Sequence, residues 1–265
     1  MYAFKYHKPA SIADAASLFA GADDARYLSG GHTLLPSMKL RLAGPSDIVD
    51  LSAIAELKGI KVEGDRVVIG AGTRHNDVAL SAEVRAAIPA LADLAGGIGD
   101  FQVRNRGTIG GSIANADPSA DYPAAVVGLG ATVHTNKREI AGDDFFTGMF
   151  ETALEDGEIV TAVSFHRPKR AAYMKFPNPA SRYAVVGVMV AETASGMRVA
   201  VTGAAPSVFR VAEMEQALAA NFAPEAIEGI TVPADDLNSD MHAAADYRAH
   251  LVTVMAKRAV AKAAG

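Results

Sequence analysis

The sequence predicts an α+β fold of one to two domains, and three observations support this class. The chain has 265 residues, half of them hydrophobic and about a fifth charged, as in a globular protein with a sizeable core. The first half mixes strand and helix patterns without regular alternation. In the second half, three strand patterns precede every helix pattern. This segregation favours α+β over repeated βαβ units. The change from mixed elements to strands followed by helices places a boundary near residues 166–172.

The first elements along the chain have clear local signals. Ser11 can cap a helix that runs to about Ala20, because a serine side chain accepts a hydrogen bond from the first helical turn. Gly64-Asp65 separates two β-branched runs and predicts a hairpin over residues 58–73. Two further strands are expected at residues 25–28 and 47–52.

The middle of the chain is expected to be helical and then irregular. A helix over residues 74–95 is interrupted near Pro89 and ended by glycines within 96–99. Residues 103–123 are polar and rich in glycine, and they predict a long loop; such loops inside compact domains tend to be functional or disordered. The remaining elements of this half are a helix at 122–130 and strands at 131–135 and 157–168.

Three strands and a helical end are expected after Pro168. The strands cover residues 171–176, 183–192 and 197–205, and "TASG" between the last two predicts a hairpin turn. The predicted helices cover residues 208–220, 224–229 and about 241–263.

Charge and composition exclude several function classes. The formal net charge is −5, so no basic surface for nucleic acid or an anionic membrane is expected. The absence of cysteine excludes disulfides, thiolate catalysis and every cluster or zinc site that needs Cys ligands. The longest apolar run, "AAVVGLGATV", is too short to span a bilayer, and no secretory signal is visible. We therefore expect a cytoplasmic protein.

Two glycine-rich segments are the strongest candidates for a binding site, at residues 29–33 and 107–112. Glycine permits φ > 0 and close approach of a ligand, and successive N–H groups can then converge on phosphate oxygens. Arg104 and Arg106 lie just upstream of the second segment and could offset phosphate charge. Taken singly, each segment is better explained by a tight turn, and neither matches the two commonest phosphate-binding fingerprints.

No metal site and no catalytic acid–base pair are predicted. The seven histidines show no H-E-x-x-H pattern and no pair at i, i+4. The paired aspartates at 23–24, 143–144 and 235–236 are typical of loops and caps, and His242 and His250 fit a solvated helix face. The methionines at 189, 197, 214 and 255 are expected to fill the core.

Three segments, taken together and in this order, are far more specific than either glycine pair alone. "SGGHTLLP", "TIGGSIANADPSADYP" and "KFPNPASRYAVVGV" resemble the FAD-binding medium subunits of molybdenum hydroxylases, the family of xanthine dehydrogenase and aerobic carbon monoxide dehydrogenase. The resemblance covers nearly the whole chain. It implies a two-lobed FAD-binding domain of the p-cresol methylhydroxylase type, with lobes at about 1–57 and 58–168. A C-terminal flavoprotein domain at 169–265 would hold a three-stranded sheet with a helix bundle.

The resemblance also implies which residues hold FAD. In such proteins the two glycine loops hold the diphosphate. The corresponding residues here are Ser29, Gly30, Gly31, His32, Thr33, Leu34, Thr108, Ile109, Gly110, Gly111 and Ser112. Relatives often have alanine in place of Ser29, serine in place of Thr33 and asparagine in place of Ser112. The exchanges at Thr33 and Ser112 keep a polar donor, although the serine at 112 is shorter.

Five further residues match cofactor contacts of the family. Asp121 corresponds to an aspartate that contacts the ribose part of FAD, and a carboxylate can accept hydroxyl hydrogen bonds there. Lys175 corresponds to a lysine near the flavin ring, Tyr183 to a tyrosine against the ring, and Ile159 and Val160 to a backbone contact. Taken singly, the same residues are also explained as a capping Asp, a solvated Lys and a core Tyr.

The implied function is that of the flavoprotein subunit of a multi-subunit oxidoreductase. The family hydroxylates its substrate at a molybdenum–molybdopterin centre on a large subunit and passes electrons through two [2Fe–2S] clusters on a small subunit. The FAD subunit then transfers them to quinone, NAD⁺ or oxygen, in a dimer of heterotrimers. A stand-alone FAD-dependent oxidoreductase acting directly on a small molecule is the alternative, and a non-catalytic nucleotide-binding module is the third possibility.

Overall fold

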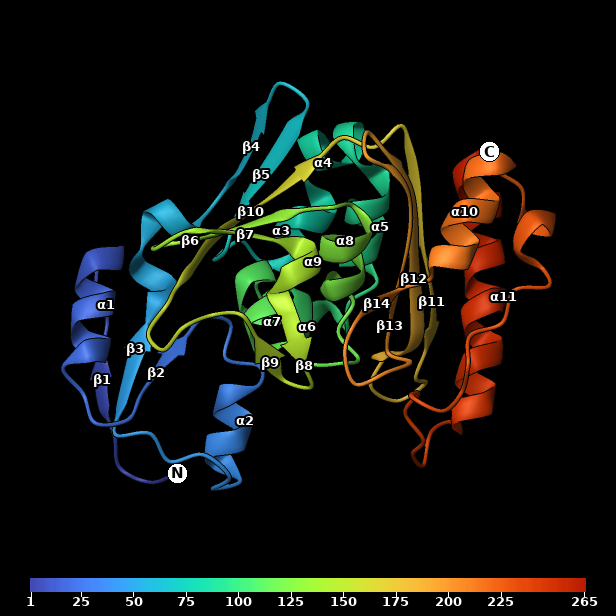
Figure 1. Cartoon of the computed structure of the whole chain (residues 1–265). Helices are drawn as coiled ribbons and strands as arrows, with labels where there is room; N and C mark the ends of the chain where they lie inside the picture. Colours follow the sequence, from blue (N-terminus) through green and yellow to red (C-terminus); the bar gives the residue numbers. More distant parts are fainter.

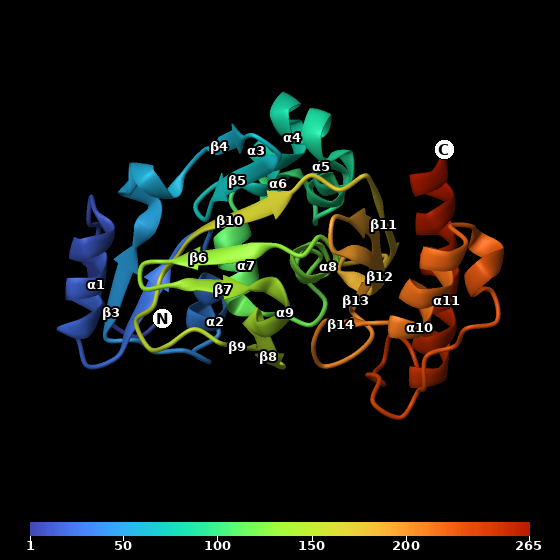
Figure 2. The same cartoon turned by 45° about the horizontal axis from the view of Figure 1, so that its top comes forward.

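The computed structural model describes all 265 residues and contains three main β-sheets (Figure 1). The first lies in the N-terminal segment, the second in the middle of the chain, and the third near the C-terminus. Helices of the middle segment lie between the second and third sheets, and the last helices cover the outer face of the third (Figure 2). The α+β class is therefore confirmed.

The N-terminal unit is a small parallel sheet in the order β1-β3-β2, with one helix packed on β2 and β3. The Ser11 side chain accepts a hydrogen bond from the Asp14 N–H and caps this helix, as predicted. The strand expected at 47–52 ends at Asp50 and continues as 3₁₀ turns. The bounds are β1 Lys5–His7, α1 Ile12–Ala20, β2 Ala25–Leu28, α2 Leu34–Lys39, β3 Asp47–Asp50, η1 Leu51–Ala53 and η2 Ala55–Leu57.

The middle sheet is antiparallel, in the order β4-β5-β10-β6-β7. The predicted hairpin is present: β4 pairs with β5 around Gly64, whose φ of 65° suits glycine. Two short strands that the sequence pattern did not indicate, β8 and β9, pair with each other. The bounds are β4 Ile60–Glu63, β5 Arg66–Gly70, β6 Thr132–Thr135, β7 Glu139–Ala141, β8 Phe146–Gly148, β9 Glu151–Thr152 and β10 Val160–His166.

The helices of the middle segment differ most from expectation. The helix expected at 74–95 with an interruption near Pro89 is three helices: the expected break lies where α5 begins, and a second break separates α3 from α4. The loop expected at 103–123 contains α7 and part of α6. Thr108 explains α7, because its side chain accepts a hydrogen bond from the Gly111 N–H and so caps a glycine-rich helix. The bounds are α3 His75–Leu80, α4 Ala82–Ala87, α5 Pro89–Gly96, α6 Phe101–Arg104, α7 Ile109–Asn115, α8 Tyr122–Gly128 and α9 Gly142–Phe145.

The C-terminal unit is an antiparallel sheet covered by helices. The three predicted strands are present, and a fourth strand of two residues joins the edge where a helix start was expected. The final helix begins at Ala245, four residues after the position that the sequence indicated. The bounds are β11 Arg170–Pro177, β12 Ala184–Thr193, β13 Gly196–Thr202, β14 Phe209–Arg210, α10 Ala212–Ala220, η3 Pro224–Ile227 and α11 Ala245–Ala264.

Three hydrophobic clusters hold these units together. The largest joins the middle sheet, its helices and the inner face of the C-terminal sheet, where Tyr173 and Met189 contribute. The second lies between that sheet and α10 and α11, and the smallest lies in the N-terminal unit. Met189, Met214 and Met255 are buried, as predicted, and Met197 is partly buried. None of the helices has both the length and the hydropathy needed to cross a membrane.

Candidate functional site

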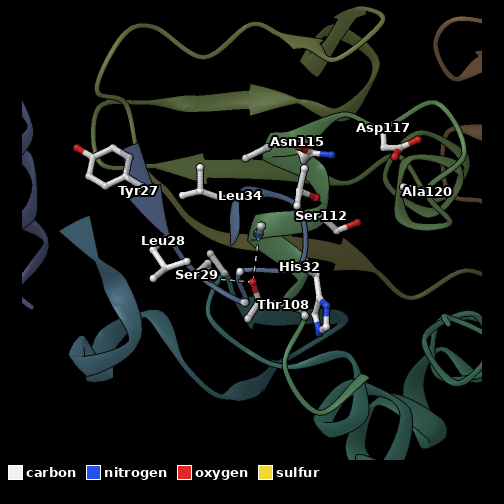
Figure 3. A pocket seen from close by; sticks show the side chains of 18 of the residues that line it. Tyr27, Leu28, Ser29, His32, Leu34, Thr108, Ser112, Asn115, Asp117 and Ala120 are labelled. Carbon is white, nitrogen blue, oxygen red and sulfur yellow. Dashed lines mark hydrogen bonds between the residues drawn. The ribbon is translucent and has the colours of Figure 1, made fainter. Parts of the chain in front are cut away.

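A cavity of about 620 Å³ lies where the N-terminal unit meets the middle segment (Figure 3). Its walls come from the first glycine loop, from α7 and the segment after it, from the start of β10, and from residues 181–183. The volume lies within the range of roughly 300–1,000 Å³ that small-molecule and cofactor sites occupy. This cavity is therefore the candidate site.

The first glycine loop has backbone N–H groups that donate no hydrogen bond within the chain. None of the backbone N–H groups of residues 30–33 donates a hydrogen bond to another atom of the chain. Gly31 has φ 77°, a conformation that L side chains rarely adopt, and it turns the chain from β2 into α2. Consecutive free N–H groups around such a turn form a concave site for an anion.

The second glycine loop uses its amides differently. The N–H of Ile109 donates to the Thr73 carbonyl at 3.1 Å, and the N–H of Gly110 donates to the Ala71 carbonyl at 2.9 Å. The expectation that both loops would offer successive amides to a ligand is therefore wrong for these two residues. Gly110 is required for packing instead, because a Cβ there would lie 2.4 Å from the Cβ of Ala71.

The two loops touch directly. The hydroxyls of Ser29 and Thr108 form a hydrogen bond of 2.8 Å, and Figure 3 shows this bond beside the cap from Thr108 to α7. Gly30 lies so close to the second loop that a Cβ would come within 2.5 Å of the Arg106 carbonyl oxygen. The second loop thus supports the first, whose donors remain available.

Most residues expected at the site line this cavity. The lining includes Ser29, Gly30, Gly31, His32, Thr33, Leu34, Thr108, Gly110, Gly111, Ser112, Asp121, Ile159, Val160 and Tyr183. Ile109 and Lys175 do not line it, and neither do Arg104 and Arg106. Ile109 is fully buried in the main core, while the Arg104 guanidinium donates to the carbonyls of Ile98 and Gly99.

Asp121 is the centre of a buried polar network. Its carboxylate accepts hydrogen bonds from the Tyr173 hydroxyl at 2.6 Å and from the Lys175 ammonium at 3.1 Å. Burial raises the pKa of Asp121, and the charge of Lys175 and the bond from Tyr173 oppose that shift. Both partners hold the carboxylate at the cavity wall.

Lys175 is not a solvated lysine, and it lies behind Asp121 rather than among the residues that line the cavity. Its ammonium donates to the carbonyl of Gly97 at 2.7 Å, to that of Arg182 at 3.0 Å, and to Asp121. Three bonds match the three donors of an ammonium group. Lys175 therefore ties the end of α5 and the loop before Tyr183 to Asp121. Tyr183 itself is 49% exposed and lines the cavity.

The lining residues that were not identified as site residues from the sequence include Arg26, His75, Asp117 and Arg182. Arg26 pairs with Asp24 at 3.0 Å, whereas the Arg182 guanidinium has no partner in the chain. Asp117 lies four residues before Asp121 in the segment "TIGGSIANADPSADYP", so the sequence motif could have identified it as a site residue. His75 had no local signal, because its neighbours form an ordinary helix start.

His75 is the buried support of the second loop. Its backbone N–H donates to the Gly107 carbonyl at 3.0 Å, and a Cβ on Gly107 would lie 2.5 Å from His75 Nε2. The Nδ1 atom is buried without a hydrogen-bond partner. Burial, with smaller contributions from His32 and Arg104, lowers the pKa of His75 to about 4, so the ring is neutral at pH 7.

The chain matches a family of known description. Residues 2–168 match the model of the FAD binding domain in molybdopterin dehydrogenase. The carbon monoxide dehydrogenase medium chain of Hydrogenophaga pseudoflava is 38% identical over 278 residues, which cover 97% of this chain and 96% of that protein.

Two solved structures have the same fold over nearly their whole length. A chain of the reconstituted CO dehydrogenase from Oligotropha carboxidovorans has 35% identity and a TM-score of 0.89, over 98% of this chain and 97% of that one. A chain of quinoline 2-oxidoreductase from Pseudomonas putida 86 has 29% identity and a TM-score of 0.89, over 99% of this chain and 97% of that one.

Proposed function

Because the chain belongs to the FAD-binding medium subunits of molybdenum hydroxylases, we propose that it binds FAD in the large cavity and transfers electrons from the [2Fe–2S] clusters of a partner subunit to an external acceptor. The observation that carries this proposal is the set of unbonded N–H groups at residues 30–33, at the wall of a cofactor-sized cavity. A diphosphate is the part of FAD that such donors would bind.

The residues present fit the whole cofactor. The free N–H groups of the first loop and the hydroxyls of Thr33 and Ser112 would hold the diphosphate, and the unpaired guanidinium of Arg182 adds a cation at the cavity wall. Asp121 would accept hydrogen bonds from the ribose. Ile159 and Val160, at the start of β10, and Tyr183 would face the flavin ring.

Lys175 would act by positioning rather than by contact. Its three bonds fix Asp121 and the backbone at Arg182, so it would hold the ribose acceptor and the Tyr183 loop in place. This role differs from that of a cation placed directly at the ring.

The redox chemistry would be supplied by the bound FAD, which can exchange electrons singly or in pairs. The chain itself would bind and orient it. A chain without cysteine cannot hold the clusters through thiolates, so the clusters and the molybdopterin centre would belong to small and large partner subunits. The assembly we propose is a dimer of heterotrimers.

Co-purification tests this proposal most directly. The tagged chain, purified at native expression level, should carry close to one FAD per chain and retain two further subunits that contain iron and molybdenum. A protein that is colourless and cannot be reconstituted with FAD would refute the cofactor assignment. A flavin-containing chain without iron or molybdenum partners would instead support a stand-alone oxidoreductase.

Asp121→Asn tests the ribose contact. We expect FAD affinity to fall by about 1–3 kcal/mol, because an amide can neither accept the same hydrogen bonds nor balance the charge of the largely buried Lys175 side chain. Titration of the apoprotein with FAD measures the change. The matched control is Asp144→Asn, at an exposed aspartate. Equal affinity in Asp121→Asn and the control would mean that Asp121 only supports the local fold.

A further inference from the structure

We propose that Asp117 is the proton-relay residue of the cofactor site, exchanging protons between the large cavity and a second, smaller cavity. This inference rests on the proposed function, because it assigns a route to the protons that accompany FAD reduction. It concerns a side chain that the family resemblance did not single out.

The second cavity adjoins the first. It has a volume of about 180 Å³ and shares three wall residues with the large cavity, namely Asp117, Ser181 and Tyr183. Its other walls come from the segment around Ser119 and Asn178, the start of β12, and the residues before and within α11. Water occupies about 30 Å³ per molecule, so this polar cavity is large enough for several waters.

Asp117 is the only carboxylate on the shared wall. One oxygen, Oδ1, accepts a hydrogen bond of 2.9 Å from the Ser119 N–H, and Oδ2 has no partner in the chain. No cation lies within ion-pair distance, in contrast to Asp121, which is paired with Lys175. Burial raises the pKa of Asp117, so its protonated form is favoured more than in an exposed aspartate.

The titratable groups around Asp117 do not neutralise it. The Tyr183 hydroxyl has no hydrogen-bond partner in the chain, and its pKa is raised by burial and by the charges of Asp117 and Asp121. Across the second cavity, Asp240 pairs with Arg248 at 2.8 Å, and His242 Nδ1 lies 3.1 Å from Asn178 Nδ2. Asp117 therefore remains the free proton carrier on the shared wall.

The proposed step balances as follows. Full reduction of FAD takes up two electrons and two protons, and iron–sulfur clusters supply electrons alone. The O–H bond at Asp117 Oδ2 breaks as its proton leaves toward the large cavity. The carboxylate then takes a proton from solvent hydronium, passed along the waters of the second cavity, and a new O–H bond forms at Oδ2. Asp117 ends each cycle unchanged, and the two protons come from solvent.

A measurement on the apoprotein tests the carrier without any flavin. In ¹³C-carboxyl-labelled apoprotein, two aspartates, Asp117 and Asp121, should titrate above the ordinary range, and of these two signals only that of Asp117 should disappear in Asp117→Asn. At pH 7 this variant should also melt at a higher temperature than wild type, because it no longer carries a charge that burial disfavours. The gain in melting temperature should vanish below the pKa of an unfolded aspartate, because residue 117 is then uncharged in both proteins. An ordinary pKa for Asp117 would overturn the proposal.

Fast photoreduction of the FAD-loaded chain tests the transfer itself. A pH-indicator dye reports proton uptake after the flash, with rates normalised to bound flavin. We expect Asp117→Asn to slow uptake at least tenfold at neutral pH, Asp117→Glu to restore most of it, and small acids such as acetate to rescue the Asn variant. Asp144→Asn is the matched control and should behave as wild type.

The outcomes separate this inference from the proposed function. A chain that binds no FAD overturns both. A chain that binds FAD but shows the same uptake rate in Asp117→Asn as in wild type overturns the relay alone. Slow uptake that small acids do not rescue, and that Asp117→Glu does not restore, would assign Asp117 a structural role and also overturn the relay.

Discussion

The two glycine loops look alike in sequence but differ in what their glycines do. In residues 29–33 the backbone N–H groups from Gly30 onward are unbonded, and Gly31 has a positive φ. In residues 107–112 the amides of Ile109 and Gly110 are bonded to the chain, and Gly110 presses against Ala71. One loop therefore presents donors, and the other serves as its support. A glycine pair alone does not distinguish these two roles.

The largest effect should come from adding a side chain in residues 107–112, here called the support loop, with Gly110→Val. The added Cβ would lie 2.4 Å from the Cβ of Ala71 and 2.8 Å from its carbonyl oxygen, and backbone cannot move aside as a flexible side chain can. We expect a loss of at least about 3 kcal/mol in the free energy of unfolding, measured by denaturant titration of the apoprotein. Gly229→Ala, where nothing lies within 4 Å, is the control. A stable Gly110→Val that fails only in FAD binding would reverse the roles of the loops.

The next effect concerns the buried imidazole beneath the support loop. His75 has a folded-state pKa of about 4, below its unfolded value, so the unfolded chain binds a proton first as pH falls. Wild type should lose up to roughly 3 kcal/mol of stability from this residue between pH 6.5 and 4, and His75→Gln should lack that component. Parallel pH–stability curves for the two proteins would contradict a neutral, buried His75.

A smaller effect is expected in the donor loop, with Gly31→Ala. The positive φ costs an alanine about 1 kcal/mol, and its Cβ would lie 2.8 Å from the flexible Leu35 side chain. Because the loop would also change shape, FAD affinity should fall more than stability does. Gly64→Ala is a matched control, since Gly64 has φ 65° in open space. Equal losses of stability with no change in FAD affinity would remove the first loop from the binding site.

The smallest effect should come from the bond that joins the loops. Ser29→Ala removes one hydrogen bond, whereas Thr108→Val removes that bond and the cap of α7. A double-mutant cycle on the free energy of unfolding should give a coupling of about 0.5–1.5 kcal/mol. Thr108→Ser keeps both hydroxyl bonds and serves as the control. Additive losses would show that the loops are held together by packing alone.

Much of the fold could be predicted because its signals are local. Ser11 caps α1, Gly64 turns the hairpin, and the long strands of the C-terminal unit have continuous apolar runs. The helix α7 was missed because glycine has poor helix propensity, and the burial of Ile109 and Ile113 that holds this helix in the core is seen only in the folded structure. The short strands β8, β9 and β14 owe their existence to pairing between segments, which no single stretch of sequence displays.

The site was predictable in its loops but not in its networks. The ordered motifs led to the cavity wall, including Asp121 and Tyr183. They did not indicate that the Tyr173 hydroxyl donates a hydrogen bond to Asp121, or that the Lys175 ammonium donates three hydrogen bonds within the protein. Three of these four contacts join positions more than fifty residues apart, such as Asp121 and Lys175, and only the bond from Lys175 to Arg182 is local. A third motif beside two glycine loops was therefore needed to identify the family.

The bond between Ser29 and Thr108 also bears on how the protein is made. The two residues are 79 positions apart, and the Tyr27 hydroxyl bonds the Gly157 carbonyl from 130 positions away. Contacts with such large sequence separation form late, since closing long loops is entropically costly before other contacts exist. A growing chain would therefore complete its donor loop only after the middle sheet has been synthesised. Bound flavin colour would then report finished folding, and FAD added early in synthesis would find no site to stabilise.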